Sequence, residues 1–239
     1  MSTYVMSDLH GQYDLYKKML KKIRFSDEDM LYILGDILDR GPHPIRIILD
    51  LMERFNVDVI VGNHCVVAMD CLRNFMLKEI TEENIEDINA CMLEKVQDWY
   101  KNGGIKTQEE LSRYDRETIQ EVISFIGDFS LYEDIEVGGK RFILVHAGLD
   151  NFRVDKPLWE YSLDELVWKR PTYEQVYFED AYVVSGHTPT MYIEGNSNPG
   201  YIYHKNNNIV IDCGCYLPEG RLACLRLDDM KEFYIKNGR

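Results

Sequence analysis

The stretch Met30-Leu31-Tyr32-Ile33-Leu34-Gly35-Asp36 decides how this chain folds, because an apolar run ends there at a small residue and an acid follows at once. Four further apolar runs share the pattern: Tyr4-Val5-Met6, Val57 to Val61, Phe142 to Val145 and Tyr182 to Val184. The segments that follow them are Ser7-Asp8-Leu9-His10, Gly62-Asn63-His64, His146-Ala147-Gly148 and Ser185-Gly186-His187. A buried strand that stops at a polar residue places that side chain on the rim of a sheet. Five converging rims predict a cluster of carboxylates, imidazoles and one amide, which points to metal-assisted hydrolysis.

Size and composition indicate one large domain over residues 1–239, with 45% hydrophobic residues and no linker or repeat. No apolar run approaches the roughly 20 residues that a membrane span requires, and the early first strand argues against a signal peptide. The six cysteines include no C-x-x-C pair. Buried, reduced thiols and a cytoplasmic location are therefore the expectation.

The net charge of −14 makes nucleic acids and anionic membranes unfavourable partners, because both bind positive surfaces. A phosphorylated protein or a small phosphoester remains a compatible substrate, since bound divalent cations can invert the local field of an acidic protein. The oligomeric state cannot be predicted from the sequence.

The chain divides into three stretches with different periodicity. Residues 1–65 alternate strands and helices, 66–127 have apolar positions at helical spacing, and strands dominate from 131 onward. We expect helices near 12–23 and 44–55, and strands at 3–6, 30–34, 57–61, 131–136, 140–145, 181–185, 201–203, 208–212, 221–227 and 232–235. The Asn-Gly-Gly at 102–104 predicts a tight loop within the helical insertion. Because both the first and the last stretch supply rim residues, two facing sheets flanked by helices are the predicted α/β architecture.

The rim residues suit two divalent metals that share one carboxylate. Carboxylate and amide oxygens and imidazole nitrogens are ligands for manganese, iron or zinc, with manganese expected first. Asp8 and His10 lie two residues apart, so on an extended segment they point the same way. We predict one metal on Asp8, His10 and Asp36, and the other on Asp36, Asn63, His146 and His187. Metals about 3.5–4 Å apart can share a hydroxide that attacks phosphorus in line.

Further polar residues fit the same reaction. Arg40 follows Asp36 by four positions and can match two phosphate oxygens with parallel hydrogen bonds. We predict His64 as the general acid for the leaving oxygen, with Asp39 orienting its ring. Arg170, in Trp168-Lys169-Arg170-Pro171, is a candidate for a second phosphate contact, and Asn63 lies beside the substrate.

Other residues have simpler interpretations. His43 and His204 follow no strand and are expected to be surface or packing residues, and Cys65 is expected to pack rather than bind metal. Tyr192, Tyr201 and Tyr203 are expected to pack against strands rather than form a platform for stacking bases.

These segments resemble the phosphoprotein phosphatase branch of the calcineurin-like metallophosphoesterases. Asp8-Leu9-His10-Gly11 resembles the first motif, and Gly35-Asp36-Ile37-Leu38-Asp39-Arg40-Gly41 matches every fixed position of the second. Gly62-Asn63-His64, His146-Ala147-Gly148 and Gly186-His187-Thr188-Pro189 match the third to fifth. The resemblance implies a four-layer α/β/β/α sandwich, hydrolysis of phosphate esters at a two-metal site, and the residue roles given above.

The chain departs from the eukaryotic members of that branch, which have glutamate where Cys65 stands and a longer C-terminal region. It looks more like the compact bacterial and phage protein phosphatases, and also like bacterial diadenosine tetraphosphate hydrolases. The leading hypothesis is hydrolysis of phosphoserine and phosphothreonine in proteins. The alternative is hydrolysis of dinucleoside polyphosphates, and a non-catalytic metal-binding module is disfavoured because all six ligands are present beside His64 and Arg40.

Overall fold

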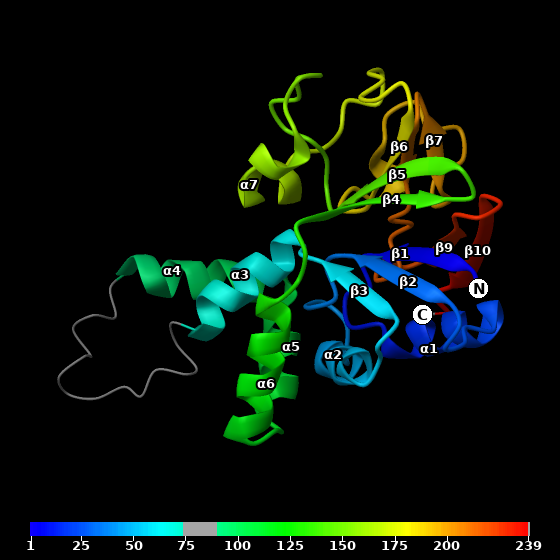
Figure 1. Ribbon diagram of the computed structural model, residues 1–239. Coiled ribbons are helices and arrows are strands. Elements are labelled where there is room, and N and C mark those ends of the chain that lie inside the picture. Colours follow the sequence, from blue (N-terminus) through cyan, green and yellow to red (C-terminus); the bar gives the residue numbers. More distant parts are fainter. Residues whose placement is uncertain (74–89, 239) are drawn as a thin grey trace.

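The computed structural model describes residues 1–73 and 90–238 and contains two five-stranded sheets (Figure 1). The first sheet has the order β10-β9-β1-β2-β3 and the second the order β4-β5-β6-β8-β7. The strands of the first are β1 (Thr3–Ser7), β2 (Met30–Leu34), β3 (Val57–Ile60), β9 (Arg221–Arg226) and β10 (Lys231–Lys236). Those of the second are β4 (Tyr132–Val137), β5 (Lys140–Val145), β6 (Ala181–Ser185), β7 (Tyr203–Lys205) and β8 (Asn208–Val210).

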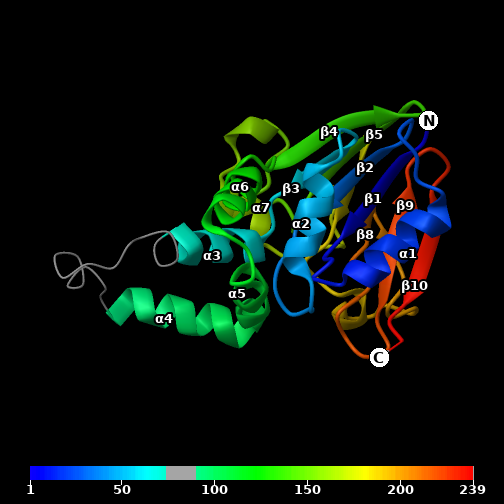
Figure 2. The same ribbon diagram turned by 90° about the horizontal axis from the view of Figure 1, so that it is seen from below.

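Side-chain alternation along the strands builds the layers. In β2, Leu31 and Ile33 face a core shared with the helices α1 (Tyr13–Ile23) and α2 (Pro44–Met52), whereas Leu34 faces the other sheet. In β5, Phe142 and Leu144 meet Leu34 between the sheets, because successive side chains of a strand point to opposite faces. Both helices cover the outer face of the first sheet (Figures 1 and 2).

The fourth layer is thin. The outer face of β5 and β6 is covered by the 3₁₀ turn η4 (Leu158–Glu160), the short helix α7 (Leu163–Val167) and nearby aromatic side chains. Ser162 caps α7 in a capping box with Glu165, which fixes where this short helix begins. The predicted four-layer α/β/β/α sandwich is confirmed.

The described part of the 66–127 stretch is helical, as expected. It comprises most of α3 (Asn63–Cys71), then α4 (Ala90–Trp99), the π-helical turn η3 (Tyr100–Gly104), α5 (Ile105–Leu111) and α6 (Arg116–Gly127). These helices project to one side of the sheets (Figure 2). The α3 helix begins at Asn63 itself, and the predicted loop near 102–104 is a kinked helical turn in which only Gly103 has a positive φ of 103°. The parts of the insertion at 74–89 lie outside the described residues.

Two strands in the strand-rich stretch differ from expectation by two residues, and β4, β9 and β10 differ by one residue at one or both ends. The strand expected over 201–203 starts and ends two residues later, at Tyr203 and Lys205, and the Tyr201 ring packs between Tyr234, 5.1 Å away, and the Arg221 guanidinium, 4.2 Å away. Strand β8 ends at Val210, two residues before the expected end. Tyr201 and Tyr203 pack against neighbouring aromatic rings, as predicted.

The five cysteines whose side chains the structure describes are buried and form no disulfide. Cys65 is fully buried in the helix-side core, which confirms its packing role. His43 Nδ1 lies 3.2 Å from Glu110 and His204 Nε2 lies 2.8 Å from Glu232, so each ring has a hydrogen-bond partner, as expected of surface or packing residues. Among the described helices, none has the length and apolar character needed to cross a membrane.

Candidate metal centre and active site

Five strands bring the predicted site residues to one rim. Strands β1, β2 and β3 run parallel to one another, and β5 runs parallel to β6, so the carboxyl ends within each set lie at the same edge. The backbone joins the two edges, because Gly186 N donates to His146 O at 2.8 Å and His187 N donates to both oxygens of Asp8 at 3.0 and 3.2 Å. Residues far apart in the sequence therefore meet between the two sheets.

The small residues that precede the ligands leave room for them. A Cβ on Gly62 would lie 2.2 Å from Asp36 Oδ1, and a Cβ on Gly186 would lie 2.1 Å from Asp8 Oδ2. Both distances are far below any contact that a side chain tolerates, so the glycines are required by the close approach of carboxylates.

Six of the predicted site residues have a positive φ, which non-glycine residues rarely adopt. They are Asp8, His10, Asp36, Asp39, Arg40 and His187, with φ between 40° and 68°. The expectation that Asp8 and His10 lie on an extended segment is wrong, because β1 ends at Ser7 and both residues turn in the left-handed region. Such strain is found where the surroundings hold side chains in a functional position.

Asp36 lies at the centre of the cluster. Its Oδ2 is 3.8 Å from His10 Nε2 and 3.6 Å from His146 Nε2, while its Oδ1 accepts the backbone N–H of His64 at 3.0 Å. One carboxylate thus faces histidines on two sides. Two sets of possible metal-ligand atoms include it: His10, Asp36 and His64, and Asp36, His146 and His187.

The His146–His187 side matches the second predicted metal site. His146 Nδ1 lies 2.8 Å from the Leu34 carbonyl, to which it donates, so its Nε2 keeps a lone pair. That Nε2 lies 2.9 Å from Asn63 Oδ1, and His187 Nδ1 lies 3.0 Å from the same oxygen. Two ring nitrogens and an amide oxygen that converge at these distances can each offer a lone pair to a cation.

The His10–His64 side differs from the first predicted site. His10 Nδ1 lies 2.9 Å from the Leu38 carbonyl, which leaves Nε2 directed at Asp36. The set of possible ligand atoms on this side contains His64 in place of Asp8. The Asp8 carboxylate instead accepts the backbone N–H of His187. Asp8 remains close enough to Asp36 for their negative charges to interact. Its role as a ligand stays a prediction.

Arg40 spans the His10–His64 side. One terminal guanidinium nitrogen lies 2.9 Å from His10 Nε2 and the other lies 2.9 Å from His64 Nε2. The guanidinium also lies over the Tyr216 ring at 4.2 Å, and the Arg40 backbone N–H donates to Gly103 O at 3.1 Å. The guanidinium fork is held between the metal-type ligands and the predicted acid.

His64 and Asp39 form a buried pair with helical support. His64 Nδ1 lies 2.6 Å from Asp39 Oδ2, as predicted. Asp39 also accepts hydrogen bonds from the Trp99 indole N–H at 3.1 Å and from the Thr107 hydroxyl at 2.6 Å. Trp99 and Thr107 come from α4 and α5, so the helical stretch fixes the carboxylate that orients His64. Neither residue was predicted, since no local pattern marks them.

The electrostatic environment separates the roles of the histidines. Burial lowers the pKa of His10 well below its ordinary value, and burial together with the nearby His146 lowers the pKa of His187 to about 4. Both rings are therefore neutral, as metal ligands must be. Burial opposes the charged form of His64 too, but the carboxylates of Asp36 and Asp39 outweigh it and raise its pKa. A raised pKa keeps the His64 ring protonated at higher pH, which suits a proton donor.

Arg170 lies near the site but is not part of its hydrogen-bonded cluster. Its side chain is exposed, and its positive charge contributes to the low pKa of His187. The segment that carries it packs on the rim, because a Cβ on Gly148 would meet Lys169 O at 2.8 Å. Its contact with a phosphate stays a prediction.

Three residues near the centre were not predicted as site residues. Asp212 is buried, and burial together with the charge of Asp36 raises its pKa to about 7. It ends the apolar run of β8, so the rim pattern could have identified it. The Tyr216 ring lies 4.8 Å from the His10 ring, and Tyr192 lies near Tyr216 and is 60% exposed. The expectation that Tyr192 packs against a strand is wrong, because it belongs to the 3₁₀ turn η5 (Thr190–Tyr192) that follows His187 and Pro189.

Comparison with known proteins identifies the family of this chain. The profile of the family described as calcineurin-like phosphoesterase matches residues 1–217. Serine/threonine-protein phosphatase 2 of Salmonella typhimurium is 24% identical over 227 residues, covering 94% of this chain and 92% of that protein. The symmetrical bis(5'-nucleosyl)-tetraphosphatase of Wigglesworthia glossinidia brevipalpis is 26% identical over 166 residues, covering 68% of this chain but only 48% of that enzyme.

Solved structures share the fold at low sequence identity. A crystal structure provisionally assigned as a diadenosine tetraphosphatase has a TM-score of 0.63 at 14% identity, covering 98% of this chain and 92% of that one. A protein serine/threonine phosphatase from Saccharomyces cerevisiae has a TM-score of 0.59 at 14% identity, covering 99% of this chain and 79% of that one. With a family profile that spans all five motifs and a fold shared along the whole length, this chain belongs to the calcineurin-like phosphoesterase family.

Proposed function

We propose that this chain hydrolyses phosphate monoesters, with phosphoserine and phosphothreonine in proteins as its substrates. The observation that carries the proposal is the position of Arg40, whose two terminal nitrogens lie between His10 and the His64–Asp39 pair. A planar guanidinium in that place can bind two oxygens of a phosphate beside a proton donor.

The donor atoms fit two divalent cations, one on each side of Asp36. His10 Nε2 and His146 Nε2 lie 3.8 and 3.6 Å from this carboxylate, and imidazole nitrogens together with carboxylate and amide oxygens suit manganese, iron or zinc. We propose Asp8, His10 and Asp36 as ligands of one cation, and Asp36, Asn63, His146 and His187 as ligands of the other. When bound, such cations lower the pKa of water and stabilise charge on a phosphoryl group.

Side chains of this protein bind the substrate and transfer the proton. Arg40 binds and orients the phosphate, and Arg170 adds a second positive charge at the rim. In this structure His64 Nε2 accepts from Arg40, which can only donate. Once a phosphate takes the hydrogen bonds of Arg40, His64 can carry a proton on Nε2 and donate it to the leaving oxygen, and Asp39 stabilises the imidazolium form through the bond to Nδ1. The hydrogen bonds from Trp99 and Thr107 hold Asp39 in place for this task.

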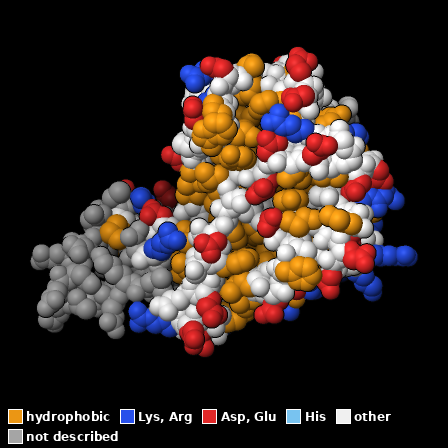
Figure 3. Space-filling model, viewed as in Figure 1, with side chains coloured by type: hydrophobic (Ala, Val, Ile, Leu, Met, Phe, Trp, Pro, Cys, Tyr) orange, Lys and Arg blue, Asp and Glu red, His pale blue; other side chains and the backbone are white. Residues whose placement is uncertain are grey.

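The protein substrate is supported by the alignment with the Salmonella phosphatase, which covers nearly all of both chains. The sequence alignments with the Wigglesworthia and Buchnera aphidicola tetraphosphatases cover 48% and 24% of those enzymes, the second at 44% identity over 66 residues, whereas the structure provisionally assigned as a diadenosine tetraphosphatase shares the fold over 92% of its length. Long-range attraction to nucleic acids or anionic membranes is not proposed, given the net charge of −14. On the face seen in Figure 3, acidic and basic side chains are interspersed, with no broad basic area among the coloured residues.

A dinucleoside polyphosphate is the second candidate substrate. Tyr216 lies over the Arg40 guanidinium, and the neighbouring Tyr192 is largely exposed. Exposed aromatic rings beside a phosphate-binding arginine can stack on a base.

Turnover of p-nitrophenyl phosphate with added manganese tests the reaction class, and parallel assays on a phosphoserine peptide and on diadenosine tetraphosphate test the substrate. We expect a larger kcat/KM for the peptide. A much larger kcat/KM for the dinucleotide would replace the first substrate by the second, and no manganese-dependent turnover of any of the three would overturn the proposed function.

A further inference from the structure

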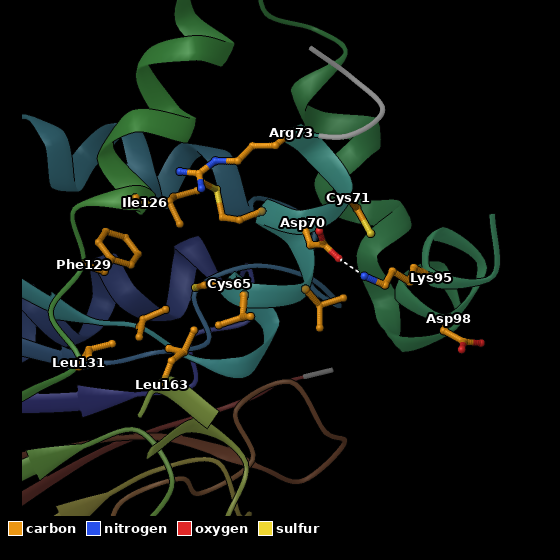
Figure 4. Close-up of a pocket in the computed structure, with 15 residues that line it drawn as sticks. Cys65, Asp70, Cys71, Arg73, Lys95, Asp98, Ile126, Phe129, Leu131 and Leu163 are labelled. Atoms are coloured by element: carbon orange, nitrogen blue, oxygen red, sulfur yellow. Dashed lines mark hydrogen bonds and ion pairs between the residues drawn. The ribbon is translucent and has the colours of Figure 1, made fainter. Parts of the chain in front are cut away.

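A cavity of about 750 Å³ lies between α3, the end of α6 and the segment that leads into β4 (Figure 4). Its apolar lining includes Cys65 and Met69 of α3, Ile126 of α6, and Phe129, Leu131 and Leu163. None of the candidate metal ligands lines it. The volume falls within the range of roughly 300–1,000 Å³ that small-molecule sites occupy.

One charged side chain of this lining, Arg73, is exposed and has no acidic partner among the described residues. Lys95 pairs with Asp70 at 2.7 Å, and Asp98 pairs with Lys101 at 2.9 Å. The Arg73 side chain extends over the cavity toward Ile126, as Figure 4 shows, and among residues 1–73 and 90–238 no acid pairs with it. A Cβ on Gly127 would lie 3.0 Å from a terminal nitrogen of Arg73, so the guanidinium rests against the bare backbone at the end of α6.

We propose that this cavity binds a small amphiphile with an apolar chain and one carboxylate. The apolar walls gain free energy by covering the chain, and Arg73 binds the carboxylate with charge-assisted hydrogen bonds at the rim. A neutral amphiphile would leave the guanidinium without a partner, and a cationic one would be repelled by it.

The cavity is separate from the metal centre, although Cys65 follows His64 directly in α3. Binding there requires neither metal nor phosphoester hydrolysis, so the test below does not depend on the proposed function.

Isothermal titration calorimetry with dodecanoate below its micellar concentration tests the proposal, with dodecanol and dodecyltrimethylammonium as probes of the same chain length. We expect one dodecanoate per chain, and at least tenfold weaker binding of the other two, as follows from losing a hydrogen bond to a charged group. No binding of dodecanoate, or equal binding of all three amphiphiles, would overturn the proposal.

Substitutions in the cavity lining test whether dodecanoate binds in this cavity. Arg73→Gln is expected to weaken dodecanoate binding roughly tenfold, while Arg116→Gln, at an exposed arginine of α6 outside the cavity, leaves it unchanged. Leu131→Glu places a negative charge at a partly exposed wall position and is expected to abolish binding even if Arg73→Gln does not fold. Unchanged affinity in a folded Arg73→Gln or Leu131→Glu variant, verified by circular dichroism, would show that dodecanoate binds elsewhere and would contradict the assignment.

Discussion

The two sides of the centre share Asp36 but are built differently. On the His146–His187 side, both histidines and Asn63 lie within three residues of a strand end, and ring nitrogens meet one amide oxygen at 2.9 and 3.0 Å. On the His10–His64 side, the rings are held by Arg40 and Asp39, and Asp39 is held in turn by α4 and α5.

We propose that this difference divides the centre into one side that only binds a cation and another side that also donates the proton. The side built from strand ends offers lone pairs and a neutral His187, which suits a cation. The side supported by helices holds a histidine whose pKa is raised by two carboxylates, which suits an acid. Variants that damage one side and spare the other test this division.

Asp36→Asn is expected to damage both sides and to have the largest effect. Losing the shared carboxylate removes charge from both ligand sets, and we expect turnover to fall by roughly 10⁴-fold, equivalent to several kcal/mol of transition-state stabilisation. Metal content and p-nitrophenyl phosphate turnover measure this loss. Asp58→Asn, at an exposed position of β3, is the matched control. Full activity in Asp36→Asn would contradict the shared role of Asp36 in the two ligand sets.

His64→Asn and His187→Asn are expected to separate the two sides. The first should lower kcat by roughly 10²- to 10³-fold, more for an alkyl phosphate than for p-nitrophenyl phosphate, whose leaving group needs less protonation. The second should lower bound manganese as well as turnover, because it removes a candidate ligand. Elemental analysis and steady-state kinetics give both quantities. Equal loss of metal in the two variants would refute the division.

Asp39→Asn is expected to shift the pH dependence of kcat, because it changes the helix-supported side. His64 must be protonated to act, so kcat is maintained below its pKa and lost as pH rises through it. In the wild type this alkaline limb lies above the ordinary value of 6.5, because Asp36 and Asp39 raise the pKa. Removing one negative charge should move the limb down by roughly one pH unit. An unchanged limb would mean that Asp39 does not control His64.

Trp99→Phe tests how much the helical stretch contributes. It removes the N–H that donates to both oxygens of Asp39 while keeping most of the apolar volume. We expect kcat to fall by roughly tenfold, the lower end of the range for residues that orient a functional group, with metal content unchanged. Trp159→Phe, at a position 77% exposed on η4, should change neither quantity. A loss of metal in Trp99→Phe would contradict the expectation that Trp99 affects only the orientation of Asp39.

Asp212 is expected to give the smallest effect, measured as the stability of the metal-free protein. A carboxyl group whose folded pKa of about 7 exceeds its ordinary 3.8 stabilises the fold fully below 3.8, and that contribution is lost as pH rises through 7. After chelation, Tm should therefore fall by a few degrees between about pH 4.5 and 7.5 from this group. Asp212→Asn should flatten that slope, and an identical slope in both proteins would exclude the assignment.

The sequence predicted the strand-built side better than the helix-supported side, for a physical reason. A strand end followed by a glycine and a ligand is a local pattern, so Asp36, Asn63, His146 and His187 could be placed before the structure was known. The same pattern predicted the two sheets. The supporting contacts of Trp99 and Thr107 depend on how α4 and α5 pack, and packing over 60 or more residues of separation leaves no local pattern.

The direction of individual side chains was also beyond local patterns. An extended segment would point Asp8 and His10 the same way, but both have positive φ, and Asp8 faces the His187 amide. The aromatic stretch that contains Tyr192 predicts packing against strands, whereas the turn after Pro189 exposes this side chain. A local pattern could have identified Asp212, because it ends an apolar run like the other rim residues.

A crystal soaked in manganese, with data collected at a wavelength where manganese scatters anomalously, tests the shared role of Asp36 most directly. The account predicts two anomalous peaks about 3.5–4 Å apart, one toward His10 and the other toward His146 and His187, with Asp36 between them. A single peak, or two peaks that do not share Asp36, would contradict it.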